Sequence, residues 1–267
     1  MVHFDRQRIL ITGASSGIGE HLAYTLAQQG ANLILVSRTE SELQRVRAHC
    51  QRPMDHQVRV MDLENINALD GQIRNIWNTL GPIDILINNA GISQRYPTQD
   101  SSITVDQKIM TVNFWGTVAL TKQAIELMLE RGSGQIVCVS SLAGLIGLKN
   151  RTIYSASKHA LRGYFESLRQ ELYQGPLKIT MIYPGYINTN LPQNALLKNG
   201  VPNGRQEKTH VGGMALEECA RRMTRAIARK RAESLVARPI ERLAVLVGRH
   251  LPAVFRWLFP RMYSNSI

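Results

Sequence analysis

The sequence predicts an α/β fold, with a doubly wound, mainly parallel sheet of about seven strands and helices on both faces. Short β-branched runs alternate with amphipathic segments of ten or more residues along most of the chain. Parallel strands need long crossover connections, which helices commonly provide. The first run also ends in a glycine-rich turn, which is typical of strand-to-helix junctions in such folds.

The expected strands are short apolar runs, and the first is RILIT at residues 8–12. Six more follow, at residues 31–37, 57–63, 82–91, 134–141, 178–185 and 233–237. Helices are expected between them, at residues 17–30, 41–50, about 73–81, 104–130, 153–172 and about 215–230. Gly30 closes the first of these helices, as a C-cap would.

The alternation lapses after Pro184-Gly185, where residues 187–213 are polar and rich in Asn, Gly and Pro. Loops of this length in a compact domain usually carry function. No repeat or linker divides the chain. We therefore expect a single domain over residues 1–239, with residues 186–214 as its substrate loop and residues 240–267 as a helical extension.

Composition is typical of soluble globular proteins, with 44% apolar and 19% charged residues among 267. Cys50, Cys138 and Cys219 lie far apart and form no CxxC pair, so we expect neither a disulfide framework nor a metal site. An apolar run begins within ten residues of Met1, and no run reaches the length of a membrane span. We therefore expect a cytoplasmic protein without a signal peptide.

The turn ITGASSGIGE places Gly13, Gly17 and Gly19 between the first strand and the first helix. Glycine lets the backbone turn tightly and approach a pyrophosphate, while the helix N-terminus offers free N–H groups. A tight turn without a ligand also favours glycine. The pattern favours dinucleotide binding over a purely structural turn.

The second strand ends in LVSRTE, which places Ser37 and Arg38 where sites that prefer NAD usually offer a carboxylate. A guanidinium suits a 2′-phosphate because it donates charge-assisted, bidentate hydrogen bonds. NADP is therefore favoured over NAD. The alternative is that Arg38 is an ordinary exposed arginine.

Tyr154 and Lys158 lie four residues apart in YSASK. On a helix, this spacing brings the phenol and the ammonium to one face. The same pair also arises by chance on solvated helices, so the spacing alone leaves both interpretations open.

Six motifs occur in order along the chain: TGASSGIG at residues 12–19, NNAG at 88–91, Asn113 in TVNFWG, Ser141 in VCVSSLAG, then YSASK and YPGYINT. Their order and spacing resemble the classical short-chain dehydrogenase/reductase family over residues 8–190, and most of all its hydroxysteroid-dehydrogenase and retinal-reductase-like branch. The resemblance implies a Rossmann fold. It also implies an NADP(H)-dependent oxidoreductase that passes a hydride between the nicotinamide and a carbonyl or alcohol carbon.

The resemblance assigns catalytic roles to four side chains. Tyr154 would donate the proton in reduction and accept it in oxidation, and the charge of Lys158 would stabilise the phenolate. Ser141 would hydrogen-bond the substrate carbonyl oxygen, and it is preferred to Ser140 because successive strand residues face opposite ways and the family spacing matches it. Asn113 would hold a helix bend and a water that relays protons to Lys158. By itself, a mid-helix asparagine is more often a cap or a kink.

The resemblance also implies a set of cofactor contacts. Ser16 stands where members that prefer NADP often have a basic residue, so the 2′-phosphate would rest on Arg38, Ser37 and Ser15. The other implied contacts are Gly13, Gly17, Ile18 and Gly19 at the pyrophosphate, Asp62 and Leu63 at the adenine, Asn89, Ala90 and Gly91 at the adenosine ribose, Tyr154 and Lys158 at the nicotinamide ribose, and Pro184, Gly185, Ile187 and Thr189 at the carboxamide.

The end of the chain is strongly basic. Residues 221–261 hold eleven Arg or Lys against two Glu, so they carry nine of the twelve net positive charges. Arg242, Arg249 and Arg256 recur every seven residues among apolar side chains. Pro252 is expected to divide this amphipathic extension into two helices.

Such an extension is compatible with three roles. It could pack on its own domain or across a subunit contact, lie on an anionic membrane as a peripheral element, or bind nucleic acid, which is the least favoured. A homo-oligomer, either a dimer or a tetramer, is expected.

The sequence therefore predicts an NADP(H)-dependent carbonyl reductase or alcohol dehydrogenase. LAGLIGL beside Ser141 and the apolar residues of the extension favour an apolar substrate. The alternative is a catalytically silent NADP-binding sensor or scaffold. The presence of the complete set Asn113, Ser141, Tyr154 and Lys158 disfavours that alternative.

Overall fold

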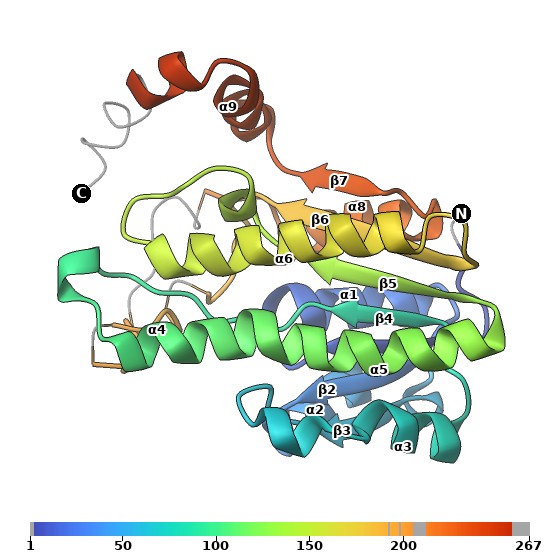
Figure 1. The fold of residues 1–267 in the computed structure, drawn as a ribbon. Helices are drawn as coiled ribbons and strands as arrows, with labels where there is room; N and C mark the ends of the chain where they lie inside the picture. Colours follow the sequence, from blue (N-terminus) through green and yellow to red (C-terminus); the bar gives the residue numbers. More distant parts are fainter. Residues whose placement is uncertain (1–2, 192, 198, 205–211, 258–267) are drawn as a thin grey trace.

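The computed structural model describes residues 3–191, 193–197, 199–204 and 212–257. Its strands are β1 Arg8–Thr12, β2 Asn32–Ser37, β3 Gln57–Val60, β4 Ile85–Asn88, β5 Gly134–Val139, β6 Leu177–Pro184 and β7 Glu233–Val236. They form one parallel sheet in the order β3-β2-β1-β4-β5-β6-β7 (Figure 1). The predicted α/β class and its seven strands are confirmed. The strand order reverses direction between β1 and β4, and such a switch point leaves a crevice at the carboxyl ends of the strands.

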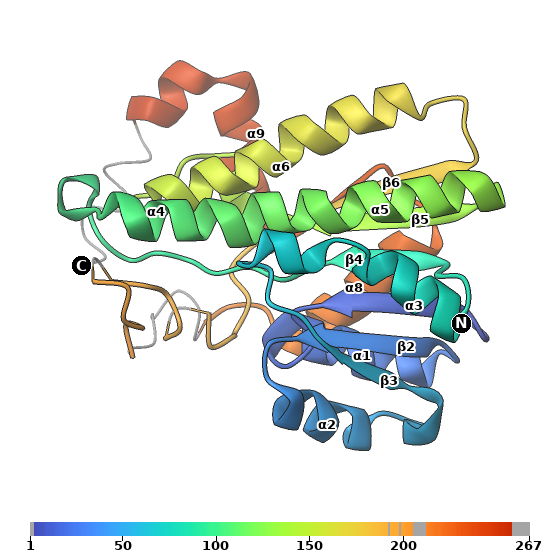
Figure 2. The ribbon, with the colours of Figure 1, turned by 60° about the horizontal axis from the view of Figure 1, so that its bottom comes forward.

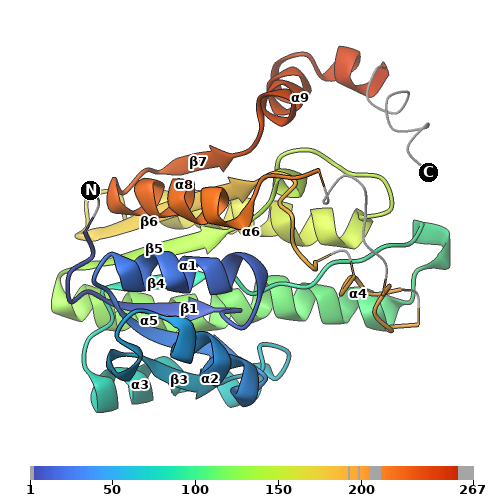
Figure 3. The ribbon, with the colours of Figure 1, turned by 180° about the vertical axis from the view of Figure 1, so that it is seen from behind.

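Helices cover both faces of the sheet, as Figures 1 and 3 show from opposite sides. On one face lie α1 Gly17–Gln28, α2 Glu40–His49 and α8 Leu216–Ala228, and on the other lie α3 Gln72–Leu80, α5 Gly116–Arg131 and α6 Thr152–Glu171. The described residues also form α4 Ile103–Met110, α9 Pro239–His250 and short 3-10 turns at Pro53–Asp55, Ile66–Leu69, Thr98–Asp100 and Leu142–Gly144.

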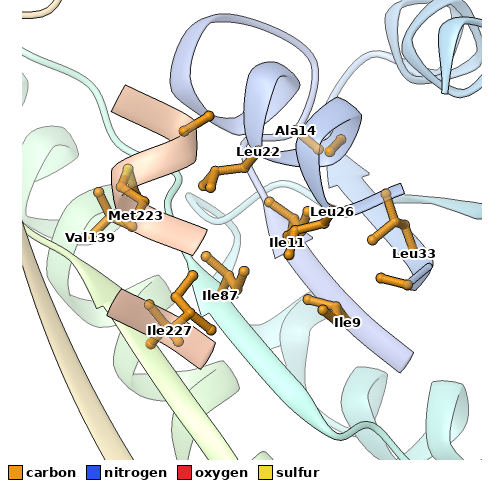
Figure 4. Close-up of a cluster of buried hydrophobic side chains, with 14 of the residues drawn as sticks. Ile9, Ile11, Ala14, Leu22, Leu26, Leu33, Ile87, Val139, Met223 and Ile227 are labelled. Atoms are coloured by element: carbon orange, nitrogen blue, oxygen red, sulfur yellow. The ribbon is translucent and has the colours of Figure 1, made fainter. Parts of the chain in front are cut away.

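Each face of the sheet has its own hydrophobic core. Ile9 and Ile11 of β1 pack with Leu22 of α1 and Met223 of α8 (Figure 4), whereas Leu10 between them belongs to the core on the opposite face. Successive strand residues point to opposite faces, so a strand covered on both sides is apolar throughout. This explains why the strands appear in the sequence as continuous apolar runs.

The long helix expected at residues 104–130 contains an interruption. It begins with α4 and ends with α5, but the π-helical turn Thr111–Trp115 separates them. A π turn hydrogen-bonds to the fifth residue along the helix instead of the fourth, and such turns recur at functional sites. Asn113 lies in the middle of this turn.

Three strands end at least two residues before their predicted limits, and the shift is smallest for β5, which ends at Val139 rather than at residue 141. β4 ends at Asn88 rather than at residue 91, because the N–H groups of Asn89 and Ala90 donate to Thr12 Oγ1, at 3.0 and 3.1 Å. β3 ends at Val60 rather than at residue 63. In all three cases the chain leaves the sheet at its carboxyl edge.

The predicted substrate loop is tied to the rest of the chain in its described part. Ile187 forms a β-bridge with Met214, and Leu196 forms bridges with Gln94 and with Pro202. Residues 192, 198 and 205–211 of the predicted loop lie outside the described residues.

The predicted C-terminal extension forms α9 and a helical turn at 252–257, which stand beyond the β7 edge of the sheet (Figures 1 and 2). The division at Pro252 is as expected. Val245 and Phe255 form a small hydrophobic cluster with Leu142 and Ile146. The last residues of the extension, 258–267, lie outside the described part of the chain. No helix among the described residues combines the length and the apolar character that crossing a membrane requires.

Candidate active site

The glycine-rich turn joins β1 to α1 at the switch point of the sheet. Gly13 and Gly17 have positive φ angles of 65° and 56°. A Cβ atom on Gly13 would lie 2.8 Å from Ala90 Cα, and one on Gly19 would overlap the carbonyl oxygen of Gly13. Only glycine lets the start of α1 pack so closely on the turn.

The ends of β1 and β4 are locked together beneath this turn. Thr12 Oγ1 accepts hydrogen bonds from two N–H groups after β4, and Asn89 Nδ2 donates to the carbonyl oxygens of Thr12 (3.0 Å) and Gly13 (3.3 Å). Asn89 therefore braces the turn from the neighbouring strand. At the other end of the turn, Ser16 precedes α1 without capping it through its side chain.

A cavity of about 610 Å³ extends from the glycine-rich turn to α6. Its volume lies within the range of about 300–1,000 Å³ that is usual for sites of ligands and cofactors. Most of the residues predicted to contact a cofactor line this cavity. They are Gly13, Ser15, Ser16, Gly17, Ile18, Ser37, Arg38, Asp62, Leu63, Asn89, Ala90, Gly91, Tyr154, Lys158 and Thr189. Gly19 does not line this cavity, because it packs against the turn.

A second, smaller cavity of about 70 Å³ adjoins the first. Ser141, Pro184, Gly185 and Ile187 line it, and all four are predicted site residues. Tyr154 lines both cavities, as do Ile18, Ser140, Thr189 and Leu191. Tyr154 therefore lies where the two cavities meet.

Two arginines near the turn differ in their partners. The Arg45 guanidinium already has protein partners, because it donates hydrogen bonds to Glu20 Oε1 at 2.7 Å and to the Ser15 carbonyl oxygen at 3.1 Å. Partial burial alone would raise the pKa of Glu20, but hydrogen bonds from Arg45 and Tyr24 hold it below its usual value. Arg38 is exposed, lines the larger cavity, and has no hydrogen bond or ion pair with any described residue. It is therefore available to an anionic ligand.

Tyr154 and Lys158 are both buried on α6, with Lys158 Nζ 5.8 Å from the centre of the tyrosine ring. Lys158 Nζ donates to the carbonyl oxygen of Val139 at 3.2 Å, and Ser140 Oγ donates to the carbonyl oxygen of Lys158 at 3.1 Å. Both bonds fix the lysine against the end of β5. Burial raises the pKa of the nearby Cys138 thiol to about 12, against the opposing charge of Lys158.

Asn113 reaches this site from the π-helical turn. Its Oδ1 accepts from Ile92 N–H at 2.8 Å, and its Nδ2 donates to the Ile92 carbonyl oxygen and to Ser157 Oγ, both at 2.9 Å. A Cβ atom on Gly91 would lie 3.2 Å from Asn113 Oδ1 and 3.3 Å from Lys158 Nζ. Asn113 lines neither cavity, so it holds the backbone around the site.

A family model of short chain dehydrogenases matches residues 7–199, which is most of the chain. The chain belongs to the short-chain dehydrogenase family.

Relatives and solved structures agree with this assignment. The dehydrogenase is 39% identical over 266 residues to the dehydrogenase/reductase SDR family protein 7-like of Anopheles gambiae, covering 97% of this chain and 84% of the relative. It shares the fold of a short chain dehydrogenase/reductase from Burkholderia phymatum in complex with NAD, with TM-score 0.81 and 24% identity over 96% of this chain and 97% of the other. It also resembles a serine dehydrogenase complexed with NADP+, with TM-score 0.76 and 25% identity over 85% and 94% of the two chains.

Membership makes the protein an oxidoreductase that uses a nicotinamide dinucleotide. The residues present fit such a cofactor, because the glycine turn forms a cradle that a Cβ atom on Gly13 would fill and the adjoining cavity is large enough. No group of His, Cys, Asp or Glu that could hold a metal ion occurs in the part of the chain that the structure describes.

Ser140 and Ser141 directly follow the end of β5, and both line the smaller cavity. Ser140 is buried and bonded to the backbone of α6. Ser141 is half-buried, accepts a hydrogen bond from Ala143 N–H at 3.1 Å, and lines the smaller cavity together with Tyr154.

Sequence reasoning missed a group of buried polar residues behind Tyr154. Ser93, Gln94 and Arg151 are all nearly or fully inaccessible. Arg151 donates to Ser93, and Gln94 hydrogen-bonds Thr152 and Tyr154 at the start of α6. Ser93 and Gln94 directly follow the NNAGI segment. Their sequence shows no periodic pattern that would distinguish a buried hydrogen-bond network from a polar surface loop. Only the fold brings them to α6.

Proposed function

We propose that this dehydrogenase is an NADP(H)-dependent carbonyl reductase or alcohol dehydrogenase that acts on an apolar substrate. The observation that carries the proposal is the position of Tyr154, which lines both cavities with the Lys158 ammonium behind its ring. A catalytically silent sensor or scaffold would need the larger cavity alone. It would not need a phenol at the junction.

In this proposal the larger cavity holds the cofactor, and most of the predicted contacts line it. The glycine turn and the N-terminus of α1 would bind the pyrophosphate, and Asp62 and Leu63 would flank the adenine. Pro184, Gly185 and Ile187 line the smaller cavity, where the carboxamide end would lie. When bound, the dinucleotide supplies or accepts the hydride.

The protein's own residues would transfer the proton to and from the substrate oxygen. The Lys158 ammonium lies near the ring and would stabilise negative charge that develops on the phenolic oxygen as its proton moves. Tyr154 would thus donate a proton to the carbonyl oxygen in reduction and accept one from the alcohol in oxidation. Ser141 Oγ would hydrogen-bond the same oxygen. Asn113 acts through the backbone and Ser157, as a positioning residue.

The lining of the smaller cavity supports an apolar substrate. Leu142, Leu148, Tyr186 and Leu191 contribute side chains to it. The first three belong to the hydrophobic cluster that α9 completes with Val245. Removing apolar surface from water would supply most of the binding free energy of such a substrate.

We expect Tyr154→Phe to lower carbonyl turnover by at least about 100-fold, because it removes the proton donor and leaves the ring in place. A panel of ketones and aldehydes with NADPH or NADH measures this, and the matched control is Tyr173→Phe at an exposed site. Equal turnover by Tyr154→Phe and the native protein would show the mechanism to be wrong. NADPH binding without turnover of any compound by the native protein would favour the silent sensor.

The preference for NADP rests on Arg38. Its exposed guanidinium has no partner among the described residues, and Ser37 and Ser15 line the cavity beside it. No carboxyl residue directly follows Ser37 at the end of β2. Glu40, the nearest carboxyl in sequence, does not line the cavity, and Asp62, which does, follows the neighbouring strand β3.

Arg38→Ala is expected to weaken NADPH binding by about 10- to 100-fold, which corresponds to the loss of a charge-assisted hydrogen bond. NADH binding should change little, because NADH has no 2′-phosphate. Fluorescence titration at fixed ionic strength measures both affinities, and Arg225→Ala on α8, which does not line the cavity, is the control. A fall of the same size for NADPH and NADH would contradict the assignment.

We also infer that the C-terminal extension, residues 240–267, makes a peripheral contact with an anionic membrane. Its described part exposes Ile240, Leu243, Leu246, Leu251, Val254 and Trp257 on the side away from the domain. Arg249 and Arg256 are exposed beside this surface and form no ion pair with a described residue. A two-fold contact between copies would bring these cations together, whereas anionic lipid complements them.

Replacing Leu243, Leu246 and Trp257 by Ser should reduce sedimentation with vesicles containing about 30% phosphatidylserine at least about fivefold. These side chains are exposed, so the fold should be retained. Ile103→Ser, at an exposed apolar residue of α4, is the control. Equal sedimentation of the native protein, the triple variant and Ile103→Ser would contradict the inference.

The expected homo-oligomer and the expected boundary between domain and extension at residue 239 stay predictions.

A further inference from the structure

We propose that Gln94 is a positioning residue that couples the substrate loop to Tyr154. This inference rests on the proposed role of Tyr154 as the proton donor. Gln94 is fully buried and lines neither cavity, so it does not touch substrate or cofactor. Its effect on the reaction would be exerted through the residues that it bonds.

The side chain of Gln94 caps the start of α6. Its Oε1 accepts from the Tyr154 N–H at 3.0 Å, and its Nε2 donates to Thr152 Oγ1 at 3.1 Å. The first N–H groups of a helix have no partner within the helix. Arg151, at the N-cap position, makes no capping bond through its side chain. Gln94 thus satisfies the backbone of the very residue that carries the phenol.

The backbone on either side of Gln94 holds the substrate loop. Leu196 N–H donates to the Ser93 carbonyl oxygen at 2.8 Å, and Arg95 N–H donates to the Leu196 carbonyl oxygen at 3.0 Å. Leu196 lines the larger cavity. One three-residue segment is therefore bonded to the loop through its main chain and to Tyr154 through its central side chain.

A second contact ties the same segment to the start of α6. Arg151 Nη1 donates to Ser93 Oγ at 2.6 Å, and Arg151 lines the smaller cavity. A shift of the loop would move residues 93–95 and, through Gln94, the first turn of α6. Tyr154 would keep its place between the cavities only while this segment is held.

The competing interpretation is that Gln94 stabilises the fold without any effect on Tyr154. The chain offers a matched control, because Gln135 in β5 is also buried and donates through Nε2 to Thr180 Oγ1 at 2.9 Å and to the Ile227 carbonyl oxygen at 3.1 Å. Gln135 lines neither cavity. Its loss would affect stability alone.

The experiment compares Gln94→Leu, Gln94→Glu and Gln135→Leu in the full chain. Gln94→Leu should lower kcat about 10- to 100-fold for the carbonyl that the native protein reduces fastest, with KM and NADPH affinity within about twofold. Gln135→Leu should lower the melting temperature comparably and leave kcat within about twofold.

Gln94→Glu should restore most of kcat, because its carboxylate still accepts from Tyr154 N–H and can accept from the Thr152 hydroxyl, at a helix end that favours negative charge. An unchanged kcat in Gln94→Leu, or equal losses in Gln94→Leu and Gln135→Leu, would overturn the proposal. So would a Gln94→Glu protein no more active than Gln94→Leu.

Hydrogen exchange resolved at the Tyr154 amide needs no substrate and separates this inference from the proposed function. Exchange there should be at least about tenfold faster in Gln94→Leu than in the native protein and unchanged in Gln135→Leu. If the native protein turned over no carbonyl, the proposed function would fail while this result still upheld the contact. An unchanged exchange rate in Gln94→Leu would overturn the coupling by itself.

Discussion

The structure of the site depends on the carboxamide of Asn113. From the π-helical turn it bonds both backbone groups of Ile92, just after β4, and donates to Ser157 on α6. Ser157 Oγ in turn donates to the carbonyl oxygen of Tyr154 at 2.7 Å. One buried side chain therefore joins the edge of the sheet, the long helix and the helix of the phenol. Because buried amides are costly to leave unpaired, these segments are held in one arrangement.

The topology of the sheet provides the space that this arrangement encloses. The order reverses between β1 and β4, so their following segments separate and leave the larger cavity above the sheet. Gly13 and Gly19 let α1 begin close to the end of β4. Hydrogen bonds between Thr12 and Asn89 join the ends of β1 and β4 below the cavity. At the far wall, α6 presents Tyr154 and Lys158 to the cavity. The fold therefore brings a dinucleotide cradle and a phenol and ammonium pair to one edge.

The sequence was sufficient where the signal is local. The strands, the glycine turn and the four-residue spacing of Tyr154 and Lys158 follow from side-chain period and from glycine geometry. The π turn was not predicted. Its one extra residue rotates the following side chains by about 100°, and α5 is buried on several sides, so its sequence does not reveal that rotation. The end of β4 was overestimated, since the predicted strand included residues 89–91, whereas the N–H groups of Asn89 and Ala90 donate to the Thr12 side chain instead of to a neighbouring strand. Gln94 was missed because its burial depends on α6, about sixty residues further along the chain. In α9, the adjacent residues Val245 and Leu246 are buried and exposed respectively, which only packing decides.

The most direct test of the account is the rate of carbonyl reduction by Asn113→Leu saturated with NADPH. Leucine is similar in size to asparagine and removes all three hydrogen bonds. We expect a rate at least about 100-fold below that of the native protein, with NADPH still bound and a cooperative melting transition retained. A rate within about twofold of native would contradict the claim that Asn113 holds Tyr154 and Lys158 in place.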